Sequence, residues 1–173
     1  MFDDIEQLIS LFNHCFSDYQ TVLVAGGGEP LYVPASAIQP AKIIFRDDYF
    51  NSALHEIAHW CIAGPARRKL EDYGYWYCPD GRDAEKQAEF EQVEVKPQAV
   101  EMAFALACGR PFRVSVDNLH GDAGDSAQFQ KRVSAQHHLY LQHGFPQRVH
   151  LFIDAIEQHL TQSRQPESLQ HDA

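Results

Sequence analysis

The sequence lacks the features of an exported, membrane-spanning or disulfide-linked protein. Its four cysteines, Cys15, Cys61, Cys78 and Cys108, contain no C-x-x-C pair, so free thiols are a better expectation than a disulfide framework. No stretch approaches the roughly 18 apolar residues of a membrane-spanning helix. The acidic start of the chain lacks a basic n-region and an apolar h-region, so we expect no secretory signal, no membrane association and a cytoplasmic protein.

Basic residues are also scarce. The chain has 14 Lys and Arg against 24 Asp and Glu, a formal net charge of −10. Direct binding to nucleic acid needs a basic footprint, so we expect none. An acidic surface attracts positively charged ligands, which favours a cationic partner, although acidity alone also serves solubility.

The pattern of apolar residues predicts one α+β domain with a small mixed sheet covered by helices. At 173 residues the chain is long enough to bury a proper core. We expect the domain to span residues 1–162, followed by a polar, flexible tail at 163–173. The predicted helices cover 4–17, 83–95, 97–107, 128–143 and 147–160, with Pro97 separating the second from the third; the predicted strands are Thr21–Ala25, Leu31–Pro34, Lys42–Arg46 and Phe112–Val116, with a glycine-rich loop at 26–30.

The most informative motif is His55-Glu56-Ile57-Ala58-His59. Two histidines four residues apart on a helix lie on the same face, where both imidazoles can bind one divalent metal. We expect this helix to begin at the potential N-caps Asn51 and Ser52 and to end before Gly64-Pro65. Its apolar neighbours predict a buried helix, and a buried ionisable side chain is costly unless it is paired or bound to a metal.

A third ligand has to come from elsewhere in the chain. The metzincin pattern is excluded, because Ile62 and Pro65 occupy the positions where that class has glycine and histidine. The remaining option is a carboxylate from a later helix. The candidates are Glu85, Glu89, Glu91, Glu94 and Glu101. We favour Glu94, which is flanked by valines and followed by Pro97, with Glu91 as the alternative on the same helix face.

Two histidines and one carboxylate serve more than one chemistry. With zinc, the set activates water, and Glu56 is then the general base of a hydrolase, either a peptidase or a nuclease. With iron(II), it is a facial triad with open positions for oxygen. A non-catalytic protein with a structural metal needs a fourth ligand, and the sequence offers no obvious one. His120 and Asp122 match the start of the common oxygenase triad, but too few strands are predicted for its jelly-roll barrel.

Three blocks of the sequence resemble one known family. They are SALHEIAHWCIAG at 52–64, YGYWYCPDGRD at 73–83 and FEQVEVKPQA at 90–99. Together they are similar to the elongation factor P hydroxylase family, and the resemblance extends over about residues 4–160. It implies a fold similar to that of the metal-dependent endoribonuclease of ribosomal RNA maturation.

The resemblance also implies an activity. The family consists of non-haem iron hydroxylases that use molecular oxygen and hydroxylate the β-lysyl-modified lysine side chain of elongation factor P. It implies iron(II) bound by His55, His59 and Glu94, with Glu56 beside the ligands. The substrate side chain carries ammonium groups, which aromatic rings and carboxylates can contact. The candidates for that contact are Tyr75, Trp76, Tyr77, Asp80 and Asp83.

Overall fold

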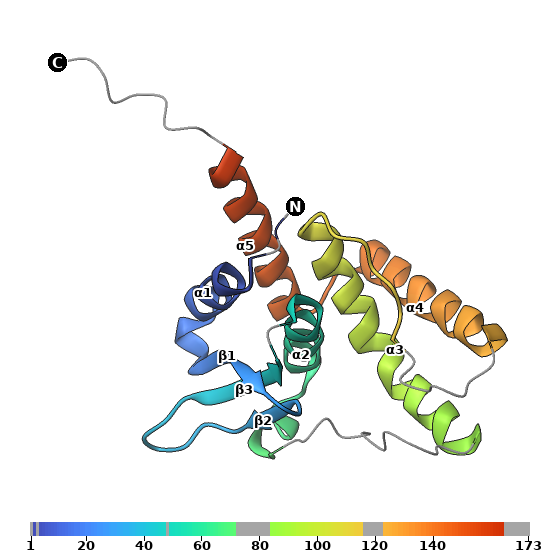
Figure 1. The fold of residues 1–173 in the computed structure, drawn as a ribbon, viewed down its shortest axis with the longest axis horizontal. Coiled ribbons are helices and arrows are strands. Elements are labelled where there is room, and N and C mark those ends of the chain that lie inside the picture. Colours follow the sequence, from blue (N-terminus) through green and yellow to red (C-terminus); the bar gives the residue numbers. More distant parts are fainter. Residues whose placement is uncertain (1, 3, 48, 72–83, 116–122, 165–173) are drawn as a thin grey trace.

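The computed structural model describes residues 2, 4–47, 49–71, 84–115 and 123–164. Within these residues it contains five α-helices and one three-stranded sheet, so the predicted α+β class is confirmed. Figure 1 shows the sheet at one end of the molecule, with α2 lying between the sheet and α3, and with α1 next to β1. None of the helices in the described ranges is both long and apolar enough to cross a bilayer.

The sheet is mixed and has the strand order β1–β3–β2. Its strands are β1 (Thr21–Gly27), β2 (Leu31–Val33) and β3 (Ala41–Arg46). The central strand β3 runs parallel to β1 and antiparallel to β2. Every second residue of β3 is buried, as expected for a strand with one face on the core.

The first strand runs further than predicted. We expected a loop from residue 26, but β1 continues to Gly27, which pairs with Arg46 after an irregularity in the register. Gly26 lies at that irregularity with φ +90°, a conformation that glycine adopts at little cost. The absence of a side chain therefore lets the strand bend and resume pairing.

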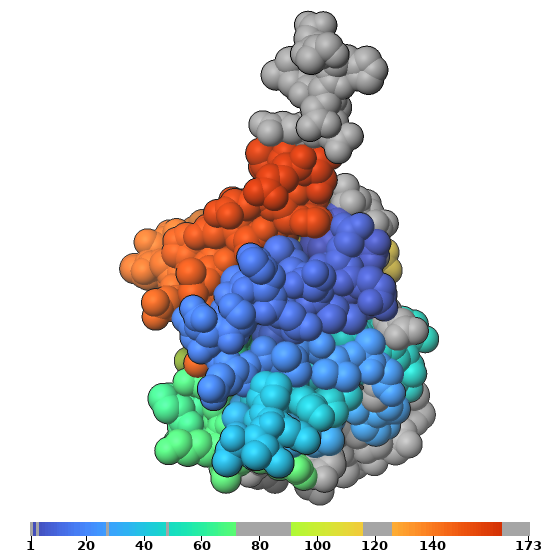
Figure 2. Space-filling model, turned by 90° about the vertical axis from the view of Figure 1, so that its left-hand side faces the viewer, coloured from blue at the N-terminus to red at the C-terminus, as the bar shows by residue number. Residues whose placement is uncertain are grey.

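Helices α1 (Ile5–Cys15) and α5 (Gln147–Arg164) lie side by side (Figure 1), and both are visible on the face shown in Figure 2, above the strands. The Asp4 carboxylate caps α1 by accepting hydrogen bonds from two backbone N–H groups of its first turn. Phe12 of α1 meets Phe152 of α5 edge to face, with 5.7 Å between ring centroids. Helix α5 passes the predicted end of the domain by two residues; the division into domain and tail stays a prediction.

Helix α2 (Phe50–Ile62) is the central element, because it packs against α3, α5, β1 and β3. It ends before Gly64-Pro65, as predicted, but the prediction for its start was wrong. Tyr49 precedes the helix without a capping side chain. Instead, the Ser52 hydroxyl accepts a hydrogen bond from the backbone N–H of Arg46. Ser52 thereby ties the end of β3 to the first turn of α2.

Helix α3 (Ala84–Ala107) is continuous, contrary to the prediction that Pro97 separates two helices. Proline removes one backbone hydrogen bond and disfavours a straight helix. Here residues on both sides of the proline pack against α2 and α4 (Ala123–His143). Pro97 itself is buried, and we infer that these tertiary contacts keep the helix continuous across it.

The predicted strand at Phe112–Val116 is not formed in its described part, residues 112–115. Phe112 and Val114 still pack against the core. The Ser115 backbone hydrogen bonds instead to a side chain, because its N–H donates to Gln98 Oε1 and its carbonyl accepts from Gln98 Nε2. A buried amide on α3 thus replaces one partner strand.

Three of the cysteines, Cys15, Cys61 and Cys108, are free, as predicted. Burial raises the pKa of the Cys108 thiol to about 12, against the opposing charge of Arg110. These thiols therefore stay protonated and behave as apolar core atoms. Cys78 lies outside the described residues.

Candidate metal centre

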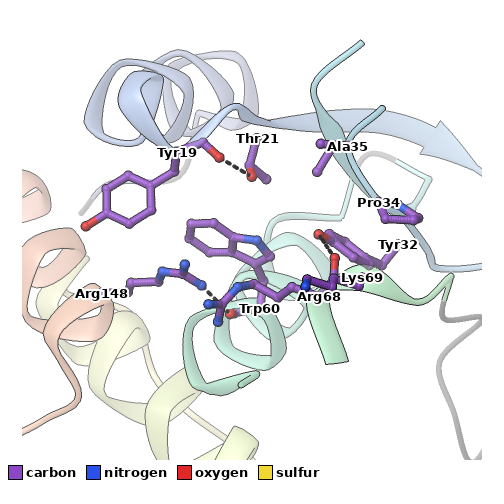
Figure 3. Close-up of a pocket in the computed structure, with 10 residues that line it drawn as sticks. Tyr19, Thr21, Tyr32, Pro34, Ala35, Trp60, Arg68, Lys69 and Arg148 are labelled. Atoms are coloured by element: carbon purple, nitrogen blue, oxygen red, sulfur yellow. Dashed lines mark hydrogen bonds between the residues drawn. The ribbon is translucent and has the colours of Figure 1, made fainter. Parts of the chain in front are cut away.

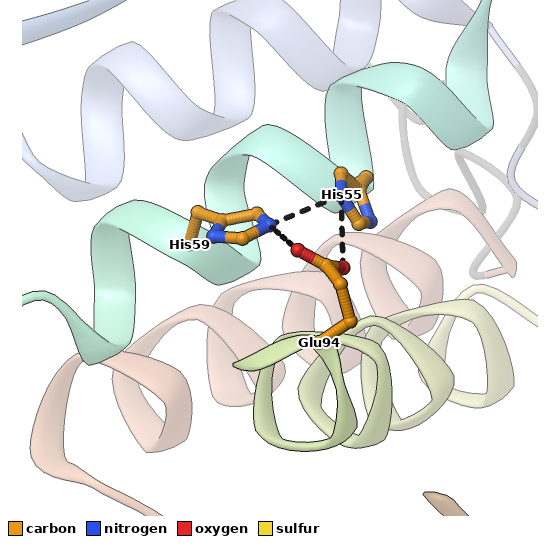
Figure 4. Close-up of side chains that lie close together, drawn as sticks. All are labelled: His55, His59 and Glu94. Carbon is orange, nitrogen blue, oxygen red and sulfur yellow. Dashed lines mark hydrogen bonds and ion pairs between the residues drawn. The ribbon is translucent and has the colours of Figure 1, made fainter. Parts of the chain in front are cut away.

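Helix α2 carries both histidines of the motif on the side that faces α3 (Figure 4). They are one helical turn apart, and the Nε2 atoms of His55 and His59 are separated by 3.1 Å. Both side chains are partly accessible, with 25% and 35% of their surface exposed. The predicted common face is therefore present, and its two ring nitrogens point at the same place.

Glu94 of α3 completes the cluster. Its Oε1 lies 3.1 Å from His59 Nε2, and its Oε2 lies 3.5 Å from His55 Nε2. The glutamate is 5% exposed, and a buried carboxylate requires partners of this kind. Among the candidate carboxylates whose side chains the structure describes, Glu94, which we favoured from the sequence, lies close to both histidines.

The distances fit a shared metal ion. Two ligand atoms that each lie about 2.1 Å from one metal ion are about 3.0 Å apart when the ligand–metal–ligand angle is about 90°. They are about 3.4 Å apart when that angle is tetrahedral. The observed separations of 3.1 and 3.5 Å between His and Glu atoms match these values. Imidazole nitrogen and carboxylate oxygen are donors that iron, zinc and other divalent transition metals accept.

Glu101 orients His55 from behind. It lies seven residues after Glu94, two turns further along the same face of α3, and its Oε2 is 2.8 Å from His55 Nδ1. When Nδ1–H donates to this carboxylate, the lone pair of Nε2 is left for a metal. A carboxylate bound to the distal nitrogen of a ligand histidine is a common arrangement at metal sites.

From the sequence, Glu101 was a candidate only for direct metal ligation, and its position behind His55 was not predicted. The spacing of seven residues between Glu94 and Glu101 was the available signal, because it places both on one helix face.

Carboxylates dominate the electrostatics of the cluster. Burial has the largest single effect on the pKa of His55 and lowers it, but the hydrogen bond and charge of Glu101, with the charges of Glu94 and Glu56, raise it to about 10. Burial raises the pKa of Glu94, but the charges of His59 and His55 and the hydrogen bonds from His59 and Gln98 outweigh burial and hold it at about 2. The site therefore attracts positive charge, whether a proton or a metal ion.

Gln98 is a second residue of the site that the sequence did not predict. It follows Glu94 by one turn, is 1% exposed and donates to Glu94 Oε2 over 3.4 Å. The same amide holds the Ser115 backbone. Gln98 therefore links the position of the carboxylate to the chain segment that follows α3. No motif in the sequence indicated this residue.

The alternative third ligand, Glu91, is engaged elsewhere. It lies one turn before Glu94 on α3 and forms an ion pair with Arg132 of α4, so it serves the contact between these two helices. Glu56 is half-buried on α2, and its charge acts on His55.

Several predicted residues lie outside the part that the structure describes. They are Tyr75, Trp76, Tyr77, Asp80 and Asp83, the residues His120 and Asp122 that match the start of the common oxygenase triad, and the side chains of Glu85 and Glu89.

The fold and the site together define a class: an α+β protein whose central helices bring two imidazoles and one carboxylate to a common point, as in mononuclear metalloenzymes. Comparison with known proteins identifies the particular family. Residues 11–170 match the model of a family described as elongation factor P hydroxylase. An elongation factor P lysine hydroxylase of Haemophilus influenzae is 49% identical over 154 residues, covering 88% of this chain and 86% of that relative. The chain belongs to the elongation factor P hydroxylase family and is an oxidoreductase, as the resemblance of its three sequence blocks implied.

Proposed function

We propose that this protein hydroxylates the β-lysyl-modified lysine side chain of elongation factor P, with iron(II) bound by His55, His59 and Glu94 and with molecular oxygen as co-substrate. Its membership of the family supports the reaction and the partner protein, and the name of the H. influenzae relative specifies lysine as the modified residue. The observation that carries the assignment to residues of this chain is the convergence of those three side chains.

The donor set supports a metal that reacts with oxygen. Three protein ligands on one side of an ion leave coordination positions open, and two histidines with one carboxylate are typical of non-haem iron(II) oxygenases. When bound, iron(II) supplies the redox chemistry that activates oxygen for insertion into a C–H bond. A zinc hydrolase with Glu56 as general base is the alternative that uses the same ligands, and only the motif favours it.

The surrounding residues hold the ligands in a single state. Glu101 accepts a hydrogen bond from Nδ1–H of His55, so that Nε2 is the nitrogen that gives up its proton when a metal binds. Glu94 stays ionised because its pKa is about 2. Gln98 restrains the Glu94 carboxylate from the next helical turn. These contacts reduce the reorganisation that metal binding requires.

We assign to Glu56, which lies beside the ligands, the role of accepting or holding a proton during turnover. Its half-buried position on α2 and the effect of its charge on His55 support this role. A carboxylate next to a ligand can orient water or a substrate ammonium group, and in this reaction it is not a peptidase base.

The binding of the lysine side chain remains assigned to Tyr75, Trp76, Tyr77, Asp80 and Asp83 as a proposal. These residues belong to the segment of sequence that connects α2 and α3, the two helices that supply the ligands. Aromatic faces and carboxylates are suitable partners for ammonium groups, and the net charge of −10 supports a cationic substrate group. A likeness of the fold to the ribosomal RNA maturation endoribonuclease is part of the same proposal.

The experiment that tests the function is a mass measurement on elongation factor P. The purified protein is loaded with iron(II) without air and mixed with β-lysylated elongation factor P and a two-electron donor, because the second atom of O2 has to be reduced to water, and oxygen is then admitted. We expect the modified protein to gain about 16 Da, one oxygen atom. No gain at full iron loading would contradict the proposal. Peptide or phosphodiester cleavage by the zinc form would favour the hydrolase.

Single substitutions assign the result to the site. His55→Ala is expected to abolish the mass gain, whereas His143→Ala, at an exposed position of α4, is the matched control and is expected to retain it. If His55→Ala unfolded the protein, a structural metal would be the better explanation. Circular dichroism of both variants distinguishes these outcomes.

A further inference from the structure

A second site lies on another side of α2 (Figure 3). It is a pocket of about 300 Å³ between the sheet, the end of α2, the short helix η2 (Arg67–Lys69) and the start of α5. Trp60 of α2 lines it and directly follows His59, so the two side chains leave the helix about 100° apart. The complete lining is Tyr19, Thr21, Tyr32, Pro34, Ala35, Ala41, Trp60, Arg68, Lys69 and Arg148.

The lining carries three cations and no carboxylate. Arg68 and Arg148 are half-buried, and Lys69 is exposed. None of the three forms an ion pair with a carboxylate in the described ranges of the chain. Arg68 and Arg148 donate hydrogen bonds to the backbone carbonyls of Ala63 and Trp60, which leave their charges uncompensated. In a protein of net charge −10, acidic partners are plentiful, so three cations around a cavity without a carboxylate partner are not explained by composition.

Arg148 is held in an unfavourable place. It is the second residue of α5, where the helix dipole disfavours a cation. Burial, and then the like charge of the Arg68 guanidinium, lower its pKa. The guanidinium of Arg148 stacks over the Trp60 ring at 4.4 Å and the Tyr19 ring at 5.0 Å. These rings fix its position without neutralising its charge.

The pocket also contains a buried hydrogen-bond donor that lacks an acceptor. Trp60 is 4% exposed, and its indole N–H has no hydrogen-bond partner among the described residues. Figure 3 shows the indole nitrogen on the edge of the ring that faces Thr21 and Tyr32. The Tyr32 hydroxyl, which donates to the carbonyl of Arg68 at 3.0 Å, is close enough for the indole N–H to lower its pKa, but the geometry between the two falls short of a hydrogen bond. An unpaired buried donor costs about 1–3 kcal/mol.

We propose that this pocket binds a small molecule bearing a phosphate or carboxylate group, whose oxygens accept the Trp60 N–H and pair with Arg68, Lys69 and Arg148. Such an anion neutralises the repelling guanidinium groups and satisfies the orphaned donor in one step. A volume of about 300 Å³ suits a small metabolite and not a large cofactor. The site is independent of the metal centre and of the proposed hydroxylation.

The test follows the Trp60 indole N–H directly by ¹H–¹⁵N NMR of the full chain. Trp60 and Trp76 are the two tryptophans, and Trp76→Phe identifies the Trp60 signal. Inorganic phosphate and succinate are titrated separately, at constant ionic strength set with chloride. We expect a saturable shift of the Trp60 signal with at least one of them, and the comparison tells a phosphate-binding pocket from a carboxylate-binding one.

Variants show whether the cations are responsible. Lys69→Gln removes an exposed charge with little risk to the fold, and Arg68→Gln removes a half-buried one. We expect each to weaken binding by about tenfold or more, while Lys131→Gln on the exposed side of α4 leaves it unchanged. The proposal is overturned if neither phosphate nor succinate gives a saturable shift, if chloride gives the same shift, or if Lys69→Gln binds as tightly as the unaltered protein.

Discussion

Two neighbouring residues of α2, His59 and Trp60, face surroundings of opposite charge. His59 and His55 are met by the carboxylates of Glu94 and Glu101, a site for a cation. Trp60 lines a pocket together with guanidinium and ammonium groups from η2 and α5, the proposed site for an anion. The comparison teaches that the net charge of −10 describes neither site, because local fields depend on which elements pack against each side of a helix.

The largest effect is expected from removing a ligand of the candidate metal centre. In His59→Ala, the cluster loses one of its three donors, and hydroxylation should fall below detection. The reduction should exceed the roughly 10–100-fold typical of residues behind the ligands. Activity is measured as the mass gain of elongation factor P, and thermal unfolding checks the fold. The two sites would not be independent if this variant also lost the anion-dependent shift of the Trp60 signal.

The next effect tests the orienting carboxylate. Glu101→Gln keeps the size of the side chain but removes the charge that holds the His55 tautomer, so metal affinity should fall about 10–100-fold. Competition with a chelator measures it. Glu91→Gln on the same helix is the matched control: it breaks the pair with Arg132 and should lower stability without changing metal affinity. Equal affinities of the two variants would remove Glu101 from the site.

A smaller effect is expected for Gln98→Ala. The variant loses the hydrogen bonds to Glu94 and to the Ser115 backbone, so the free energy of unfolding should fall by about 1–2 kcal/mol. Denaturant titration of the metal-free protein measures this change. Metal affinity should decline less than in Glu101→Gln, since Glu94 keeps both histidines. A larger decline would mean that Gln98 is what positions the carboxylate.

The smallest effect is expected from a substitution in the proposed anion-binding pocket. Trp60→Phe removes an N–H that has no partner in the described structure and keeps most of the ring against Phe12 and Phe16. In buffer without phosphate or carboxylate, stability should change by less than about 1 kcal/mol, and metal affinity should not change. Succinate or phosphate should stabilise the unaltered protein against heat more than the variant. Equal stabilisation would show that the indole N–H does not contact the anion.

Much of the arrangement was predictable from local pattern. The apolar periodicity of residues 4–17 and the alternation in 42–46 are properties of neighbouring residues, and the helix and the strand follow from them. The spacing of His55 and His59 likewise places both on one helix face. Glu94 was favoured because it lies between valines before a proline, and the structure brings it to the histidines.

The errors share a physical cause. Pro97 was expected to separate two helices, yet contacts with α2 and α4 keep α3 continuous. Residues 112–115 have the composition of a strand, yet Gln98 supplies the hydrogen bonds of the Ser115 backbone. In both places, interactions with residues distant in sequence outweigh a local preference of about 1–3 kcal/mol.

The amino-acid sequence by itself determined the α+β class, the metal-binding motif on its helix and the family, because each depends on residue types at short or characteristic spacings. Only the tertiary structure decided that Glu94 reaches the histidines while Glu91 pairs with Arg132, that Glu101 lies behind His55, and that three cations line the same pocket as Trp60. Those relations depend on how α3, α5 and η2 pack around α2, and the free energy of that packing comes from a core shared by the whole chain.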